Sequence, residues 1–421
     1  MNNVIYFSYI FLSILFVVCF QPPNSTDMIG PQWFNLSLIN FLFLPFFIRN
    51  NLYDFLIKIF KKPIFRLFLI FSLFNFLSLF TAKNVSIYFH DLARFLSVFI
   101  FFILISYSFS KLRYAQIKSV LFVILSILLL VEFILSFYPY FALLWGRGLS
   151  IFFNINYDSG SFKGIAGNKN VTAALYVIKL PFLFYLLQSS RKILNVFGSF
   201  FLFITIMLII LLDARASYVS FAIISVLSIL FSFIYLKKSF FKFFIIFAFT
   251  SCFSYIVADQ LFMSNSSVNA IDSVKSISFS NESSSNRFSL WTDAIEFIYH
   301  NPLGVGLGNW KIESIPYWKS FGGGYQIPYH AHNDYLEIAT ETGILNSLVF
   351  LSVLFLSIFI FLKRFFIFKD PFYLMFLLAV IVYGIDAFFN FPFERTYMQL
   401  VLYTTLSFTL FEPSNSNDTD K

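Results

Sequence analysis

Two histidines in the segment His330-Ala331-His332-Asn333-Asp334 are the clearest candidates for acid–base chemistry. An unperturbed imidazole has a pKa of about 6.5, so it can accept a proton from a hydroxyl group near neutral pH. A His-x-His pair can also hold a metal ion, with Asp334 or Glu337 as further ligands, but no HExxH motif or remote Cys/His group completes a tetrahedral set. We therefore favour proton transfer over a metal site, and we expect no metal and no cofactor.

Two arginines have the chemistry needed to hold a phosphate group. A guanidinium stays protonated and donates to phosphate oxygens through a planar fork. Arg215 lies in a short turn between two apolar runs, and Arg287 begins a predicted helix. The competing interpretations are a snorkelling interfacial side chain for Arg215 and a surface charge at a helix start for Arg287.

Other charges lie inside apolar runs, where they are costly. Lys179 either pairs with Glu132 or Asp386 in a helix bundle or attracts a phosphate, and we favour pairing. Asp91 and Arg94 are three residues apart, so they are expected to pair on one helix.

Three alternating glycines, Gly304, Gly306 and Gly308, follow the helix that begins at Arg287. A phosphate-binding loop would need a preceding strand and a following Lys-Ser/Thr pair, and the sequence offers neither. The glycines therefore predict a flexible turn after a helix.

The composition indicates which elements must position these residues. Of 421 residues, 59% are hydrophobic and only 12% are charged, against about 25% in soluble proteins. This excludes a disordered chain, an ordinary soluble enzyme and a nucleic-acid binder.

The apolar runs are continuous and do not alternate as in an outer-membrane barrel. The two cysteines, Cys19 and Cys252, lie inside apolar runs and form no metal or disulfide motif. The predicted fold is an all-α, polytopic membrane helix bundle embedded in a lipid bilayer.

A helix crosses a bilayer core with about 20 apolar residues. The first apolar run has no basic residues before it and no clear cleavage site after it, so we interpret it as a span and not as a signal peptide. The chain then divides into spans 1–9 within residues 1–258, a long connection at 259–335, and spans 10–12 with a tail at 336–421. The twelve predicted spans are 4–20, 33–48, 67–81, 87–110, 119–138, 170–188, 193–212, 216–236, 243–258, 336–362, 371–390 and 396–411.

Lys and Arg residues are unevenly distributed over the connections between these spans. The connections at 49–66, 111–118, 189–192, 237–242 and 363–370 carry 16 of them, whereas the shorter intervening connections carry 6. Because cytoplasmic loops are enriched in Lys and Arg, both termini are predicted to be cytoplasmic. With no organelle-targeting signal visible, we expect a bacterial inner membrane with the 259–335 connection in the periplasm.

The long connection has two parts. The stretch from Ser264 to Asn286 is rich in Ser and Asn and is expected to be flexible. A helix of about 14 residues is predicted from Arg287 to His300, with Asn286 as its N-cap. Its expected apolar stripe, facing the membrane surface or the bundle, consists of Phe288, Trp291, Ile295 and Ile298.

The segment from His332 to Gly343 resembles the signature of the O-antigen ligase and polymerase superfamily. In that signature, a His followed by Asn, Ser or Gln precedes nine residues and a GxxG. Here nine residues separate Asn333 from Gly343, and Asn346 replaces the final Gly. The similarity covers roughly residues 165–346, and the twelve predicted spans with one large late periplasmic loop resemble the family's topology. Three upstream stretches resemble family segments in the same order: Gly167-Asn168-Lys169-Asn170, the turn at 212–217, and residues 286–306.

The resemblance implies an O-antigen ligase-type glycosyltransferase, which moves a glycan from an undecaprenyl-diphosphate carrier to an acceptor hydroxyl at the periplasmic face. It implies His332 as the general base, at the membrane boundary just before the predicted span 336–362. Direct attack on the anomeric carbon would give inversion without a metal. The supporting candidates are Arg215 and Arg287 for the diphosphate, with His330, Asn333 and Lys179 as secondary site residues.

The sequence leaves the acceptor open. We prefer a ligase acting on lipid A core to a polymerase, whose acceptor is another carrier-linked repeat, and a protein O-oligosaccharyltransferase is the third branch. A polysaccharide transporter or flippase is the alternative from another class. A long far-side connection with a capped helix is unusual in transporters, and no paired broken helices indicate inverted repeats.

Overall fold

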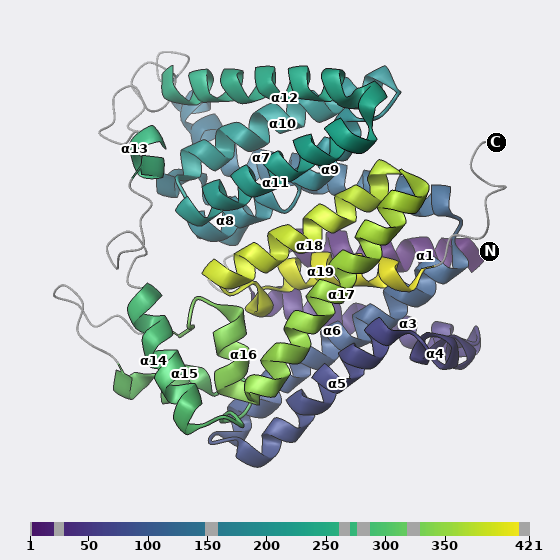
Figure 1. Cartoon of the computed structure of the whole chain (residues 1–421), viewed down its shortest axis with the longest axis vertical. Coiled ribbons are helices and arrows are strands. Elements are labelled where there is room, and N and C mark those ends of the chain that lie inside the picture. The colour runs from purple at the N-terminus through teal and green to yellow at the C-terminus, as the bar shows by residue number, and fades with distance from the viewer. Residues whose placement is uncertain are drawn as a thin grey trace. The chain divides into compact units, whose positions relative to one another are not determined.

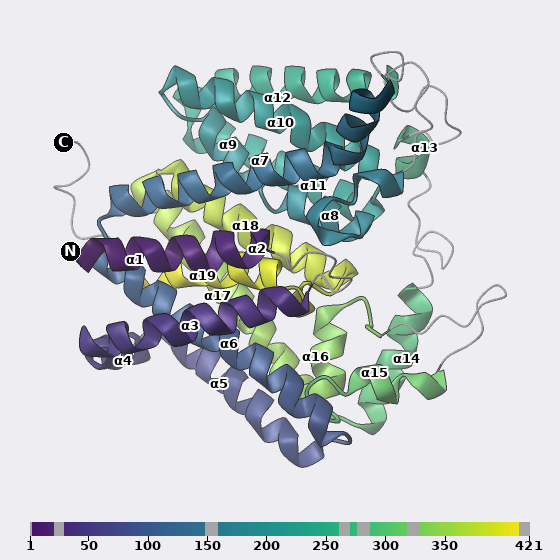
Figure 2. The same cartoon turned by 180° about the vertical axis from the view of Figure 1, so that it is seen from behind.

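The computed structural model describes residues 2–20, 29–147, 159–260, 270–275, 287–317 and 329–411. Within these ranges every regular element is a helix and no strand is present, which confirms the all-α prediction. Figure 1 shows the helices from one side, and Figure 2 shows them from the other.

Ten helical segments in the described part of the chain are long and apolar enough to cross a membrane. Each overlaps one predicted span, which confirms a polytopic helical membrane protein. The helices are α3 (Gly30–Arg49), α5 (Pro63–Leu77) continued by the 3-10 turn η2 (Ser78–Thr81), α6 (Val85–Lys111), α7 (Tyr114–Arg147), α8 (Lys169–Val177) continued by α9 (Leu180–Leu187), α10 (Lys192–Leu212), α11 (Arg215–Tyr235), α12 (Lys237–Ala258), α17 (Ile344–Phe368) and α18 (Pro371–Phe389).

The two remaining predicted spans are helical but shorter. Residues Asn3–Cys19 are covered by α1 (Asn2–Phe11), the π-helical turn η1 (Leu12–Phe16) and α2 (Val17–Cys19). The last is α19 (Thr396–Leu410), which has 15 residues and is buried along almost its whole length. It lies against α6, so its apolar side chains are covered by neighbouring helices.

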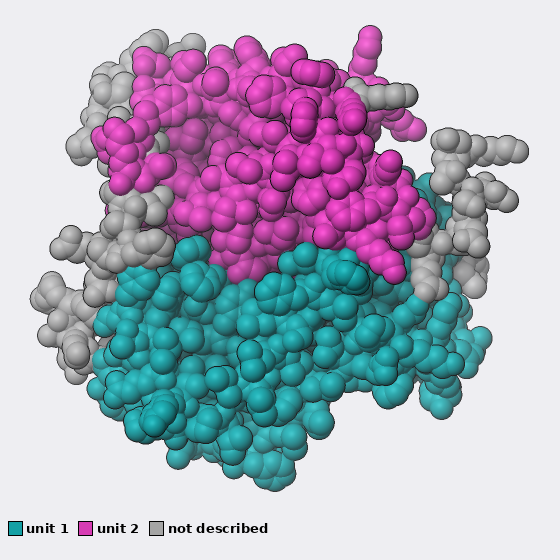
Figure 3. Space-filling view, in the orientation of Figure 1, with its two compact units in different colours: residues 1–121, 280–360, 387–421 teal, residues 122–279, 361–386 magenta. Residues whose placement is uncertain are grey.

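The chain forms two compact units, which Figure 3 shows in different colours. Unit 1 contains residues 1–121, 280–360 and 387–421, and unit 2 contains residues 122–279 and 361–386. Both units combine segments that are far apart in the sequence. The predicted division of the chain at residues 258 and 335 separates the membrane spans from the long connection. It describes membrane topology and not these compact units, and it stays a prediction.

Aromatic side chains fill the interior of unit 1. Phe68 on α5 contacts Phe95 and Phe102 on α6 and Tyr403 on α19, at centroid distances of 6.4, 4.8 and 5.3 Å. All four side chains are buried. Such pairs contribute about 0.5–1.5 kcal/mol each beyond the burial of their area. The contacts join three helices that are distant in sequence into one frame.

Polar pairs connect the helices of unit 2, where α10 lies against α9 and α12 (Figures 1 and 2). Lys179, at the break between α8 and α9, forms a buried ion pair with Glu132 of α7, and its Nζ also donates to the carbonyl oxygen of Leu175 at 2.7 Å. Gln188 donates to Ser232 Oγ at 2.9 Å. The pairing that we favoured for Lys179 is confirmed, with Glu132 as the partner.

The predicted helix of the long connection is present. It is α14 (Arg287–His300), the same fourteen residues as predicted. Its buried face centres on Ala294 and Phe297, whereas Ile295 is 57% exposed. The prediction that Ile295 belongs to the buried stripe was therefore wrong. The buried face lies part of a helical turn away, because the helix packs Phe297 against Trp310 of the same connection.

Two predictions for the long connection fall partly outside the described residues. The predicted N-cap Asn286 lies outside them. Within the stretch from Ser264 to Asn286, the structure describes only α13 (Ala270–Lys275), which is helical. Flexibility was therefore the wrong expectation for these six residues, and it stays a prediction for the others.

The predicted span 336–362 is two helices. α16 (Asp334–Thr342) ends at Gly343, and the membrane-length helix α17 begins at Ile344. Gly343 has a φ of +94°, which continues no α-helix and which few residues other than glycine adopt. The prediction that the span starts near Leu336 was wrong, so His332 precedes a separate nine-residue helix and not the span itself.

Candidate functional site

The glycine-rich turn after α14 closes the end of α16. The Val305 amide donates to the Thr340 carbonyl at 3.1 Å, and the Gly306 amide donates to the Glu341 carbonyl at 2.8 Å. These bonds satisfy carbonyl groups that a helix end leaves free. Gly304 has a φ of +77° and lies directly against the same helix end. The turn is thus docked on α16, contrary to the predicted flexibility, and its amides point at protein carbonyls instead of a phosphate.

Replacing Gly304 by Ala is expected to destabilise this docking. The new Cβ would lie 2.4 Å from the Glu341 carbonyl oxygen, in a backbone conformation that costs about 1–3 kcal/mol for residues other than glycine. Thermal unfolding of the purified variant should show a lower midpoint than the wild type. Leu303→Ala is the matched control, because Leu303 is adjacent and 70% exposed. Equal unfolding midpoints for Gly304→Ala and the wild type would contradict this role of the turn.

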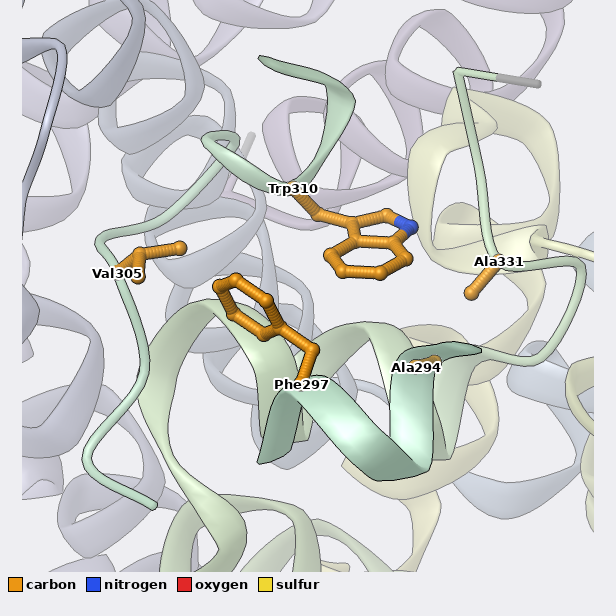
Figure 4. Packing of buried hydrophobic residues seen from close by; sticks show 5 residues of the cluster. All are labelled: Ala294, Phe297, Val305, Trp310 and Ala331. Carbon is orange, nitrogen blue, oxygen red and sulfur yellow. The ribbon is translucent and has the colours of Figure 1, made fainter. Parts of the chain in front are cut away.

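A small hydrophobic cluster anchors the segment between the two candidate histidines. Figure 4 shows its five buried members: Ala294, Phe297, Val305, Trp310 and Ala331. The rings of Phe297 and Trp310 meet edge to face at 5.2 Å. Ala331 is 1% exposed and belongs to this cluster, whereas the flanking His330 and His332 both contact the ring of Phe391. The cluster holds Ala331 in place, and the imidazoles on either side of it both contact Phe391.

His330 is held by a carboxylate of α16. Its Nδ1 donates to Glu337 Oε1 at 2.7 Å, while Glu337 Oε2 accepts the Ala331 amide at 2.9 Å. The imidazole stacks on Phe391, with centroids 4.1 Å apart and an interplanar angle of 17°. Burial disfavours the charged ring, but Glu337, with a smaller contribution from Glu394, outweighs burial and raises the pKa of His330.

His332 has the opposite environment. Its backbone is left-handed, with a φ of +52°, and its Nδ1 atom is buried without a hydrogen bond among the described residues. The ring meets Phe391 edge to face at 5.1 Å. Burial, together with the positive charges of Arg287, His330 and Arg395, lowers the pKa of His332 to about 3. The pKa values of the two histidines are therefore shifted in opposite directions, and at neutral pH His332 is uncharged and able to accept a proton.

Two arginines, from different segments of the chain, place positive charge at the site. Arg287 begins α14, and its Nη2 donates to Asn390 Oδ1 at 3.2 Å. Arg395 follows the 3-10 turn η8 (Pro392–Glu394), and its guanidinium lies 4.4 Å from the ring centroid of Phe391. Both cations lower the pKa of His332, as charges close to the imidazole do. This corner of unit 1 thus combines an uncharged imidazole with guanidinium groups.

Two carboxylates, the buried Glu341 and the half-buried Glu394, lie near the same corner. Glu394 accepts from Arg94 at 3.2 Å, and Glu341 accepts the Trp310 amide at 3.3 Å. Burial and the nearby Glu337 raise the pKa of Glu341 well above its usual range, and burial with Asp91 raises that of Glu394. The predicted pair of Asp91 with Arg94 is present at 3.5 Å.

The other two predicted site residues, Arg215 and Lys179, belong to unit 2. Arg215 begins α11 after Asp213, whose φ of +48° makes the sharp turn that the sequence predicted. Tyr218 stabilises this turn by donating to Asp213 Oδ1 at 3.2 Å. Lys179 is the buried partner of Glu132. The structure therefore brings Arg287, His330 and His332 together within unit 1 and describes Arg215 and Lys179 in another unit.

Residues 200–351 match one family model, described as O-antigen ligase (Wzy_C). This part of the chain is similar to the O-antigen ligase family. The match includes Arg215, Arg287, His330 and His332 and ends within α17. No curated protein matches the chain in a sequence comparison.

Two asparagines of the matched region have structural roles. Asn333 caps α16, because its side chain accepts the Leu336 amide at 3.1 Å. Asn346, where the family signature has glycine, is fully buried and donates to Thr342 Oγ1 at 2.8 Å. This bond accommodates the departure from the signature.

Sequence reasoning missed three residues that complete the candidate site: Glu337 as the partner of His330, Phe391 as the shared ring, and Arg395. Phe391 is one of 66 phenylalanines and carries no sequence signal of its own. Arg395 did carry one. It is an arginine in a connection on the Arg-poor side of the predicted topology, as Arg215 is.

Proposed function

We propose that the protein is a membrane glycosyltransferase that moves a glycan from undecaprenyl diphosphate to an acceptor hydroxyl at the periplasmic face of a bacterial inner membrane. The observation that carries this proposal is the uncharged His332, which contacts Phe391 together with Arg395 and lies close enough to Arg287 for that charge to lower its pKa. His332 and Arg287 both lie in the region similar to the O-antigen ligase family. In this assignment both chain termini are cytoplasmic.

The reaction needs two groups from the protein. A diphosphate leaves as a stable anion, so it requires positive charge more than a proton donor, and Arg287 supplies that charge through a fork that fits phosphate oxygens. The acceptor hydroxyl must lose a proton as its oxygen attacks the anomeric carbon, and His332 accepts it. A single displacement inverts the anomeric configuration. Arg215 is proposed as a further diphosphate contact on the family resemblance alone.

The low pKa of His332 makes donor binding part of its activation. With a pKa of about 3, the free imidazole is uncharged but only weakly basic. Part of the lowering comes from Arg287 and Arg395, and a bound diphosphate offsets those charges. The donor therefore raises the basicity of His332 at the moment when the acceptor hydroxyl must be deprotonated.

Transfer is proposed to be metal-independent, because guanidinium groups provide the charge that a divalent ion supplies in other phosphate-handling sites. Excess chelator should leave the transfer rate of the purified protein unchanged. Loss of activity in EDTA, restored by one added divalent ion, would contradict this and favour a metal site at His330 and His332.

Lipid A core is the preferred acceptor, which makes the protein an O-antigen ligase. An O-antigen polymerase and a protein O-oligosaccharyltransferase are the alternatives. The glycan profile of a deletion strain separates them. Loss of all long chains from lipid A core, with carrier-linked polymer retained, identifies a ligase. A single repeat on the core identifies a polymerase, and unchanged lipopolysaccharide with an unglycosylated protein identifies the third branch.

A further inference from the structure

Both oxygens of the Glu337 carboxylate are used to hold one short segment. Oε1 accepts from His330 Nδ1 and Oε2 accepts from the Ala331 amide, and the carboxylate is 7% exposed. A group that accepts two hydrogen bonds in this way is acting as a carboxylate, so His330 Nδ1 carries a hydrogen. The second ring nitrogen, Nε2, has no hydrogen bond to any residue that the structure describes. The stacking on Phe391 at 4.1 Å fixes the plane of the ring.

We infer that His330 is a cationic contact for the diphosphate of the donor, held in place by Glu337; this rests on the proposed function of the site. The fixed Nδ1–H bond leaves Nε2–H of the imidazolium as a donor to a phosphate oxygen. No bond is made or broken at His330. The two histidines then have separate tasks, since His330 binds the leaving group and His332 accepts the acceptor's proton.

The charged groups around His330 set the pH range of this contact. Glu337 on α16 and Glu394 in η8 favour the imidazolium, Arg395 opposes it, and His332 is uncharged. Because the pKa of His330 is raised, the cation is present below that pKa and is lost as the pH rises through it. Donor affinity should therefore weaken as the pH rises through this raised pKa.

The test measures donor KM, and the inhibition constant of sugar-free undecaprenyl diphosphate, as functions of pH. His330→Gln keeps an amide that can donate to Glu337 but removes the charge. Both constants should rise about 10- to 100-fold near neutral pH, because one hydrogen bond to a charged group contributes about that factor to affinity. The alkaline weakening of the wild type should be absent in this variant. His300→Gln, on an exposed histidine at the end of α14, is the matched control.

Glu337→Gln provides a second, independent readout. It removes the group that raises the pKa of His330, so the loss of donor affinity should begin at a lower pH than in the wild type. Glu296→Gln, which changes an exposed carboxylate on α14, should leave the pH dependence of donor affinity unchanged. This shift remains measurable if His330→Gln does not fold.

Two failures can be told apart. A wild-type protein that transfers no glycan at any pH contradicts the proposed function. An active wild type whose donor KM and inhibition constant are the same in His330→Gln, or whose pH profile is the same in Glu337→Gln, overturns the assignment of His330 and leaves the proposed function intact.

Discussion

Replacing His332 by Ala should reduce glycan transfer by about 10²- to 10⁴-fold, the usual contribution of a general base. His330→Ala should be milder, because it removes a binding contact and leaves the base. The wild-type kcat, which reports the donor-bound enzyme, should rise with pH through an imidazole pKa, and this rise should be absent from the residual activity of His332→Ala. The kcat/KM for the donor should show no His332 limb between about pH 5 and 9, since the free imidazole is already uncharged there.

His300→Ala is the control for this experiment, because that side chain is exposed at the end of α14. All three variants should be compared at equal amounts of folded protein in the membrane. Full transfer by His332→Ala, or a dead His330→Ala beside an active His332→Ala, would show that the base has been assigned to the wrong imidazole.

Arg287→Lys should lower transfer by about 10²- to 10³-fold, the cost of losing one preorganised electrostatic contact in a transition state. Lysine keeps the positive charge but loses the planar fork, including the geometry of the bond to Asn390. Arg215→Lys is expected to behave similarly, on the strength of the family resemblance. Transfer rates and membrane insertion of each variant are the measurements.

Arg113→Lys serves as the control, because Arg113 is an exposed arginine outside the site. If Arg287→Lys and Arg215→Lys both transfer at the wild-type rate with normal expression, guanidinium geometry has no part in binding the diphosphate. If only Arg215→Lys is fully active, the diphosphate contact is confined to the site in unit 1.

Periodic features of the sequence predicted most of the fold. Continuous apolar runs located the ten membrane-length helices, and a three-to-four spacing of apolar residues located α14 with its bounds. The break at Gly343 was missed because the predicted span was extended back to Leu336 over a segment that contains Glu337 and Glu341. Only the backbone conformation of that glycine, fixed by the docking of the turn at Gly304, separates α16 from α17.

The site was only partly predictable for a related reason. The chemistry of His332 and Arg287 could be predicted from their residue types, and both residues lie in segments that resemble those of a known family. Their partners depend on packing between distant segments: Phe391 and Arg395 lie about 60 residues from the histidines, and Asn390 lies 103 residues from Arg287. The contrasting charge states of His330 and His332 follow from Glu337 and from burial, neither of which a sequence shows by itself.

The most direct test of the account is glycan transfer by the purified protein in proteoliposomes, with undecaprenyl-diphosphate-linked glycan and lipid A core supplied on the face that carries α14 and no ion gradient present. The account predicts covalent transfer of the glycan to the acceptor, with release of undecaprenyl diphosphate, and its near-complete loss in His332→Ala. Movement of intact donor across the membrane without any covalent change would contradict the account and identify a transporter.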